Sequence, residues 1–114
     1  MSKYVKSFKV SEIFNKRGKL FQLDEETEVA IFKVQDVIYV VDNFCPHNHS
    51  PLMYQGYIED NEYVVCPIHA FRFNLKTGEQ PHGKGCKLRI FDYKIEGEYI
   101  YIKKPSFRIF NFEF

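Results

Sequence analysis

The strongest constraint on the fold is a close series of short strand-like segments separated by turn signals. The chain of 114 residues contains 12 Phe and 8 Tyr, and aromatic residues favour strands over helices. Turn-forming sequences such as EDNE, KTGE and PHGKG lie between the segments. The predicted strands are 19–23, 29–34, 37–42, 56–59, 63–66, 71–75, 87–96 and 99–103. Many short strands at this spacing predict an all-β, antiparallel sandwich or barrel.

Local signals add detail to this expectation. Only Gln35 and Asp36 separate the segments 29–34 and 37–42, so these two strands are expected to form a hairpin. The one helix candidate is about one turn near SEIF, with Ser11 as its N-cap. No repeat or low-complexity linker divides the sequence, and we expect residues 1–114 to form a single domain.

Composition excludes several classes of protein. The net charge of +1 argues against a nucleic-acid-binding protein, which usually carries a clear basic excess. No apolar run is long enough to span a membrane, and the N-terminal sequence lacks the apolar core of a signal peptide. The 3 Cys are an odd number and do not suit a disulfide framework. We therefore expect a cytoplasmic protein whose cysteines are metal ligands or inert thiols.

Two segments stand out chemically because each combines a Cys, a Pro and a His. The first contains Cys45 and His47, and the second contains Cys66 and His69. Cys45 follows one predicted strand and Cys66 closes another, and each is followed by Pro, which cannot donate a ladder hydrogen bond. Each pair therefore opens a loop, and four metal-binding side chains converge if the two loops lie side by side.

Two kinds of metal centre suit two thiolates and two imidazoles. A structural Zn²⁺ site with two Cys and two His is chemically sensible, but its common pattern groups Cys with Cys and His with His. Here each loop supplies one ligand of each kind. That mixed arrangement suits a two-iron cluster in which one iron takes both thiolates and the other takes both imidazoles.

The spacing Cys45-x-His47 and Cys66-x-x-His69 resembles the motif of the Rieske [2Fe–2S] family. The similarity continues through FNLKTGE and the later LRIFDYKIEGEYIYI, so it covers most of the chain. It implies one [2Fe–2S] cluster, with the two Cys on the inner iron and the two His on the outer iron at the tip of the protein. It also implies a cluster-binding subdomain, roughly residues 43–83, raised on a basal barrel formed by the remainder.

Other residues of the two loops are assigned through the same resemblance. The two prolines would stiffen the loops, and Leu52 and Ile68 would help to shield the cluster. One branch of the family joins the loops by a disulfide, but Ser50 and Ile68 stand at the required positions. That branch also places hydroxyl groups near the cluster sulfurs, where this chain has Phe71 and Phe73.

The absence of these hydroxyl groups predicts a low reduction potential. Hydrogen bonds to sulfur raise the potential of such clusters, so a value near the lower end of the Rieske range, about −150 mV, is expected here. The resemblance is therefore to the soluble ferredoxins that supply electrons to aromatic-ring oxygenases.

Three further residues with reactive side chains are expected to be structural. His49 stands where many family members have Gly, and its loop is expected to be reshaped with the imidazole in solvent. His82 lies in a predicted turn. Cys86 has no His at ligand spacing and is expected to be a buried, inert thiol.

The C-terminal segment 105–114 extends past the usual final strand of the family. It contains Phe107, Phe110, Phe112 and Phe114, the last three in strand-like alternation. We expect this segment to cover the protein's own barrel, since exposed apolar patches are uncommon on monomers. The alternative is that it pairs with another chain at a sheet edge.

The predicted function is that of a one-electron carrier and not of an enzyme. An oxygenase needs a separate mononuclear iron site with two His and a carboxylate, and only two His remain beyond the four candidate ligands. The resemblance implies electron flow from a flavin-dependent reductase to a terminal oxygenase or a similar acceptor, with a monomer favoured. The alternatives are the small Rieske-like subunit of an assimilatory nitrite reductase and a Zn-stabilised interaction module.

Overall fold

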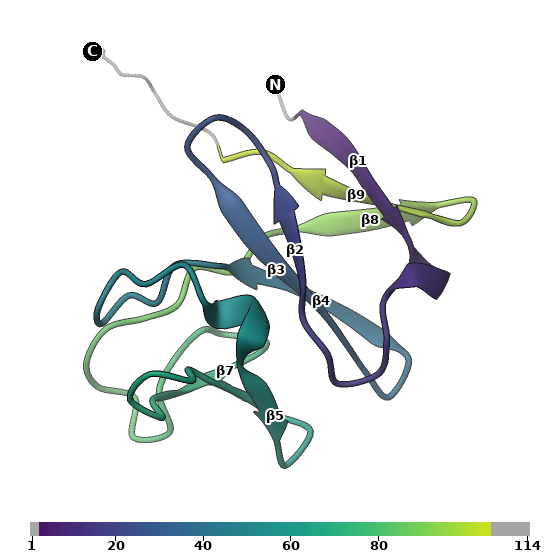
Figure 1. Ribbon diagram of the computed structural model, residues 1–114. Helices are drawn as coiled ribbons and strands as arrows, with labels where there is room; N and C mark the ends of the chain where they lie inside the picture. The colour runs from purple at the N-terminus through teal and green to yellow at the C-terminus, as the bar shows by residue number, and fades with distance from the viewer. Residues whose placement is uncertain (1–2, 106–114) are drawn as a thin grey trace.

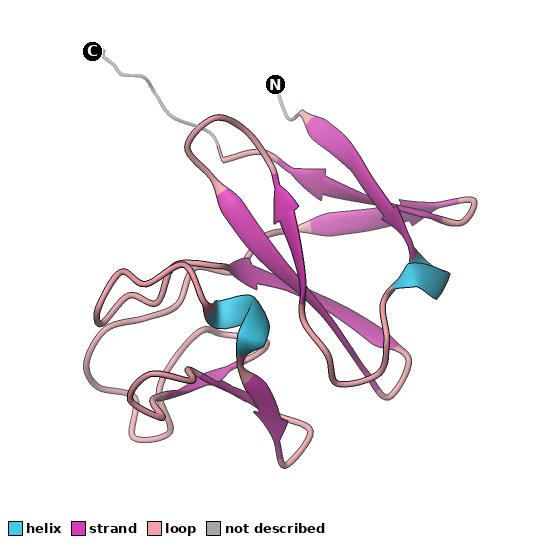
Figure 2. Ribbon diagram, in the orientation of Figure 1, coloured by secondary structure: helices cyan, strands magenta, loops and turns pink. Residues whose placement is uncertain are grey.

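The computed structural model describes residues 3–105 and shows three antiparallel sheets joined by turns and two short 3₁₀ helices (Figures 1 and 2). The strand orders are β1-β9-β8, β2-β3-β4 and β5-β6-β7. The elements are β1 (Tyr4–Lys9), η1 (Val10–Glu12), β2 (Lys19–Gln22), β3 (Glu28–Val34), β4 (Val37–Asp42), η2 (Met53–Gln55), β5 (Tyr57–Glu59), β6 (Tyr63–Val65), β7 (Arg72–Asn74), β8 (Tyr93–Glu96) and β9 (Tyr99–Lys103). The predicted all-β, antiparallel fold is confirmed.

Strand β3 lies at the centre of the molecule and is buried on both faces. Successive side chains of a strand point to opposite faces. Ala30 and Phe32 pack into one core, which also contains Cys45 and Cys66. Ile31 packs into a second core, formed with sheet β1-β9-β8. The middle sheet therefore separates the part of the molecule that carries the cysteines from the part formed by the two chain ends.

The β3–β4 hairpin follows the sequence prediction. The two strands pair from Val29 and Asp42 to Val34 and Val37. Gln35 and Asp36, which form the turn, have φ values of 52° and 65°. Such left-handed residues are what a two-residue turn requires if its twist is to match that of the flanking strands.

Strand β1 was not predicted because its place in a sheet depends on a distant partner. It pairs with β9, at the other end of the chain, and the register shifts between Lys6 and Lys9. The 3₁₀ helix η1 follows directly, but Ser11 lies inside it and is not its cap. Instead, the Lys9 backbone N–H donates to the Glu12 carboxylate at 2.9 Å. The second 3₁₀ helix, η2, was also not predicted.

The predicted strand 87–96 is divided between two sheets. Only its second half forms β8. In the first half, Ile90 forms an isolated bridge with Val41, and Phe91 N–H donates to the Val40 carbonyl at 2.9 Å. This half therefore covers the edge of β4, whereas β8 pairs with β9. A continuous apolar pattern does not reveal such a change of partner.

The candidate loops lie on the side of the molecule that carries sheet β5-β6-β7, at the lower left of Figure 1. The first loop joins β4 to η2, and the second joins β6 to β7. Among the residues from 3 to 105, no helix is long and apolar enough to cross a bilayer. The Phe residues of the C-terminal segment lie outside the described residues.

Candidate functional site

The first loop begins at Cys45, whose side chain is buried. The Cys45 backbone N–H donates to the Ser50 carbonyl at 3.0 Å, and His49 N–H donates to the Cys45 carbonyl at 2.7 Å. His49 has a φ of 60°, in the left-handed region. This backbone, which His adopts less readily than Gly, lets the loop turn back on itself within five residues.

The second loop repeats this backbone arrangement. Cys66 is buried, and its N–H donates to the Phe71 carbonyl at 2.9 Å. Ala70 N–H donates to the Cys66 carbonyl at 2.9 Å, and Ala70 has a φ of 58°. The two loops thus present their cysteines from equivalent positions at the loop bases.

The histidines occupy different places in these equivalent loops. His47 is two residues after its Cys, whereas His69 is three residues after its Cys. Both side chains are exposed, and their ring centroids lie 5.5 Å apart with an interplanar angle of 72°. The structure therefore brings all four predicted ligands into one region, with thiols inside and imidazoles outside.

The surroundings of the Cys45 thiol act on its pKa in two opposing directions. Burial is the main reason that the pKa of Cys45 is raised above its ordinary value, and the neighbouring Cys66 thiol raises it further. Backbone hydrogen bonds from His47 and Asn48 act in the opposite direction. These N–H groups are positioned to stabilise a thiolate, which is the form that ligates a metal.

A buried asparagine that the sequence analysis did not identify anchors the first loop. Asn43 Nδ2 donates to Glu28 Oε1 at 3.0 Å and to the Pro51 carbonyl at 2.9 Å. Its Oδ1 accepts the Tyr54 N–H at 2.9 Å. Because these bonds join β3, the end of the loop and η2, they fix the position of Cys45. A single polar residue after a strand gives no sequence signal for such a role.

Two side chains contact the imidazoles directly. Asn48 Nδ2 lies 3.1 Å from His69 Nδ1, across the gap between the loops. The Phe71 ring centroid lies 4.2 Å from that of His47 and 6.3 Å from that of His69. Both histidines are therefore in contact with residues of the loops themselves.

Three further residues named in the sequence analysis are His82, Cys86 and Ile68. His82 Nδ1 accepts the Lys84 N–H at 3.0 Å, which is a local turn interaction. Cys86 is half-buried and not buried as expected, and Gln80 Nε2 lies 3.7 Å from its sulfur. Ile68 is 45% exposed, so much of its side chain faces solvent.

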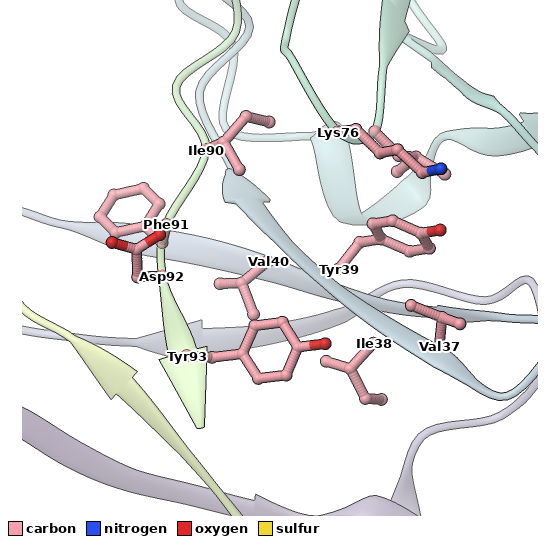
Figure 3. Close-up of a pocket in the computed structure, with 10 residues that line it drawn as sticks. Val37, Ile38, Tyr39, Val40, Lys76, Ile90, Phe91, Asp92 and Tyr93 are labelled. Atoms are coloured by element: carbon pink, nitrogen blue, oxygen red, sulfur yellow. The ribbon is translucent and has the colours of Figure 1, made fainter. Parts of the chain in front are cut away.

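One hollow of the described surface lies apart from the four candidate ligands. It has a volume of about 300 Å³ and lies between β4 and the segment that leads into β8 (Figure 3). Its walls are formed by Val37, Ile38, Tyr39, Val40, Leu75, Lys76, Ile90, Phe91, Asp92 and Tyr93. Neither a thiol nor an imidazole lines it, so the metal chemistry of the chain belongs to the loops.

The donor set fits an asymmetric two-iron cluster. Two buried thiols lie side by side, and two exposed imidazoles lie close to each other. A Rieske-type cluster takes two Cys on one iron and two His on the other. Within residues 3–105, no group of three or more His, Cys, Asp and Glu side chains surrounds a position for a single metal ion.

Comparison with known proteins identifies the family. The model of the Rieske-like [2Fe–2S] domain matches residues 3–103. The ferredoxin subunit of 3-phenylpropionate/cinnamic acid dioxygenase from Shigella boydii is 33% identical over 90 residues, which are 78% of this chain and 84% of that protein. The corresponding subunit from Escherichia coli K12 is 37% identical over 62 residues, covering 54% of this chain and 58% of that protein.

Solved structures share the fold at lower identity. The structure described as the small subunit of an NADH-dependent nitrite reductase from Mycobacterium tuberculosis has a TM-score of 0.85 at 19% identity, covering 94% of this chain and 99% of that one. The ferredoxin of carbazole 1,9a-dioxygenase from Nocardioides aromaticivorans has a TM-score of 0.76 at 22% identity, and the match covers 87% of this chain and 95% of that one.

The sequence relatives and the family model agree with the chemistry of the loops. The protein is an electron carrier that binds one Rieske-type [2Fe–2S] cluster. The chain belongs to the family of Rieske-like [2Fe–2S] domains.

Proposed function

We propose that Cys45 and Cys66 bind one iron of the cluster and that His47 and His69 bind the other. The observation that supports this assignment is the separation of the donors by depth. Both thiols are almost fully buried, whereas both imidazoles are exposed. The bound cluster would supply a centre that accepts and releases one electron, and replacement of two thiolates by neutral imidazoles favours its reduction relative to an all-Cys cluster.

The buried cysteines and the exposed histidines have different proposed roles at the cluster. Burial of the thiols excludes water from the sulfur ligands, which keeps the inner side of the site in a medium of low polarity. The exposed imidazoles of His47 and His69 offer a short route to a partner that docks at the loops. Segment 43–83, which contains both loops, is proposed as the cluster-binding subdomain of a single domain.

The proposed partners are a flavin-dependent reductase as donor and a terminal oxygenase as acceptor. This proposal is supported by the curated relatives, which are ferredoxin subunits of a dioxygenase. It is also supported by the similarity to the carbazole 1,9a-dioxygenase ferredoxin in the structure described as a complex of reduced oxygenase and oxidised ferredoxin, with a TM-score of 0.77. A monomer is proposed, and a cytoplasmic location is proposed because none of the three cysteines forms a disulfide.

A second candidate is the small subunit of a nitrite reductase. It is favoured by the TM-score of 0.85 with the Mycobacterium tuberculosis structure and by the TM-score of 0.76 with a second structure described as the small subunit of a nitrite reductase. The sequence relatives at 33% and 37% identity favour the ferredoxin function over this one.

Isolation of the tagged protein from its own cells tests the choice between these functions. A ferredoxin is expected to co-purify with a flavoprotein reductase or an oxygenase, and the isolated reductase should reduce it in a stopped-flow experiment. Stoichiometric recovery of a sirohaem enzyme, with no reduction by a flavoprotein, would instead establish the nitrite reductase function. A variant with Cys86→Ser provides the control, because this thiol is not among the proposed ligands.

A further inference from the structure

Phe71 is in contact with both exposed histidines. Its ring centroid lies 4.2 Å from that of His47, with an interplanar angle of 34°. The same ring meets His69 at 6.3 Å and 69°, closer to an edge-on arrangement. One aromatic side chain of the second loop therefore touches a histidine from each loop.

The position of Phe71 is itself well fixed. Its carbonyl accepts the Cys66 N–H at 2.9 Å, which closes the second loop. Its side chain is half-buried and packs against the core that contains both cysteines. The next strand, β7, begins directly after it and pairs with β6, so the backbone at Phe71 has little freedom to move.

The histidines differ in how they are held. His69 has Asn48 Nδ2 within hydrogen-bonding distance of its Nδ1, at 3.1 Å. Among the hydrogen bonds found within residues 3–105, none involves the His47 ring, whose partner is the face of Phe71. Fixing the exposed His47 side chain in one rotamer costs conformational entropy, and no side-chain hydrogen bond found within residues 3–105 offsets that cost. Aromatic contacts offset part of that cost.

We propose that Phe71 is a positioning residue that fixes the orientation of the His47 imidazole relative to His69. This inference rests on the proposed function, since it assumes that both imidazoles bind iron. The Phe71 ring holds the His47 ring in one orientation through their contact at 4.2 Å. Phe71 acts through His47 and is not itself a ligand.

Substitution of Phe71 by Leu tests the proposal in the full-length, cluster-loaded protein. Leu keeps an apolar side chain of similar size but lacks the aromatic face, whereas Phe71→Tyr keeps that face. The control is Phe14→Leu, because Phe14 is 69% exposed and lies in the segment between η1 and β2, away from the loops. Two readouts are used: the ¹⁴N couplings in pulsed EPR of the reduced protein, and the rate at which a chelator removes iron.

Phe71→Leu is expected to change the ¹⁴N couplings of one imidazole and to speed iron release by about two- to tenfold, the range that corresponds to loss of one aromatic contact. Phe71→Tyr should keep the ¹⁴N couplings of the parent, and Phe14→Leu should match the parent in both readouts. Unchanged couplings in Phe71→Leu would overturn the proposal, even if iron release became faster. If the parent protein itself lacked ¹⁴N couplings, the ligand assignment would fail instead, so the two failures are distinguishable.

Discussion

His49 and Ala70 occupy the same position in the two loops and share the same left-handed backbone, with φ values of 60° and 58°. Each is the fifth residue counted from a cysteine, Cys45 or Cys66, and each donates its N–H to the carbonyl of that cysteine. Left-handed φ values favour Gly over residues that carry a Cβ atom. Both loops thus adopt a strained turn to bring thiol and imidazole to one place.

Replacement of either residue by Gly should stabilise the protein. The left-handed conformation costs a residue with a side chain roughly 1–2 kcal/mol. Gly avoids this cost but loses more backbone entropy on folding, which offsets about half of the benefit. A net increase of about 0.5–1 kcal/mol in the free energy of unfolding is therefore expected. The gain should be larger for Ala70→Gly, because His tolerates this region better than Ala. Urea unfolding of the loaded protein measures the change.

Lys87→Gly serves as the control for this experiment. Lys87 is exposed and is not among the residues with positive φ. There Gly should lower the stability by about 0.5–1 kcal/mol, through entropy alone. Equal destabilisation at all three positions would show that the strain at His49 and Ala70 is absent.

The three cysteines should respond differently to substitution by Ser. Cys45→Ser and Cys66→Ser should each abolish stable iron binding, because the proposed inner iron would lose one of its two thiolates. Cys86→Ser should keep the iron content and visible absorbance of the parent. Iron analysis and absorption spectra of the three purified variants check this. Retention of the full cluster in Cys45→Ser or in Cys66→Ser would refute the ligand assignment.

The stability of the fold should depend on pH through Asp42. Burial is the main reason that the pKa of Asp42 is raised above its ordinary value of 3.8, and it outweighs both the Phe44 N–H and the Arg89 guanidinium, which lies 3.4 Å away. Between 3.8 and the raised value, the folded state binds more protons than the unfolded state. Stability contributed by this group therefore falls as pH rises through that window.

The variant Asp42→Asn isolates this contribution, because its amide oxygen can still accept the Phe44 N–H bond that Asp42 makes at 3.0 Å. Urea midpoints of parent and variant are compared from acid to neutral pH. The urea midpoint of Asp42→Asn should increase relative to that of the parent as pH rises through the window above 3.8. A difference that is constant across this range would contradict the raised pKa.

The reduction potential should lie near the lower end of the Rieske range, at about −150 mV. Phe71 and Phe73, which follow Cys66 and His69, carry no hydroxyl that can donate to sulfur. Protein-film voltammetry of the loaded protein measures the value. A midpoint above about +100 mV, deep in the Rieske range, would show that other groups supply such hydrogen bonds.

The sequence predicted local features better than long-range ones. The Cys and His pairs were recognisable because ligand spacing is local, and the β3–β4 hairpin because its turn has only two residues. Strand β1 was missed because it is defined by pairing with β9 at the other end of the chain. The contacts of Phe71 with His47 and the bonds of Asn43 depend on how separate loops meet, which no pattern within one segment reveals.

The most direct test of the account is metal analysis combined with low-temperature pulsed EPR of the anaerobically purified, dithionite-reduced protein. The account predicts two irons and no zinc for each chain, one unpaired spin, and couplings to two imidazole nitrogens that disappear singly in His47→Ala and His69→Ala. A colourless protein that contains zinc, or an iron cluster without nitrogen couplings, would contradict it.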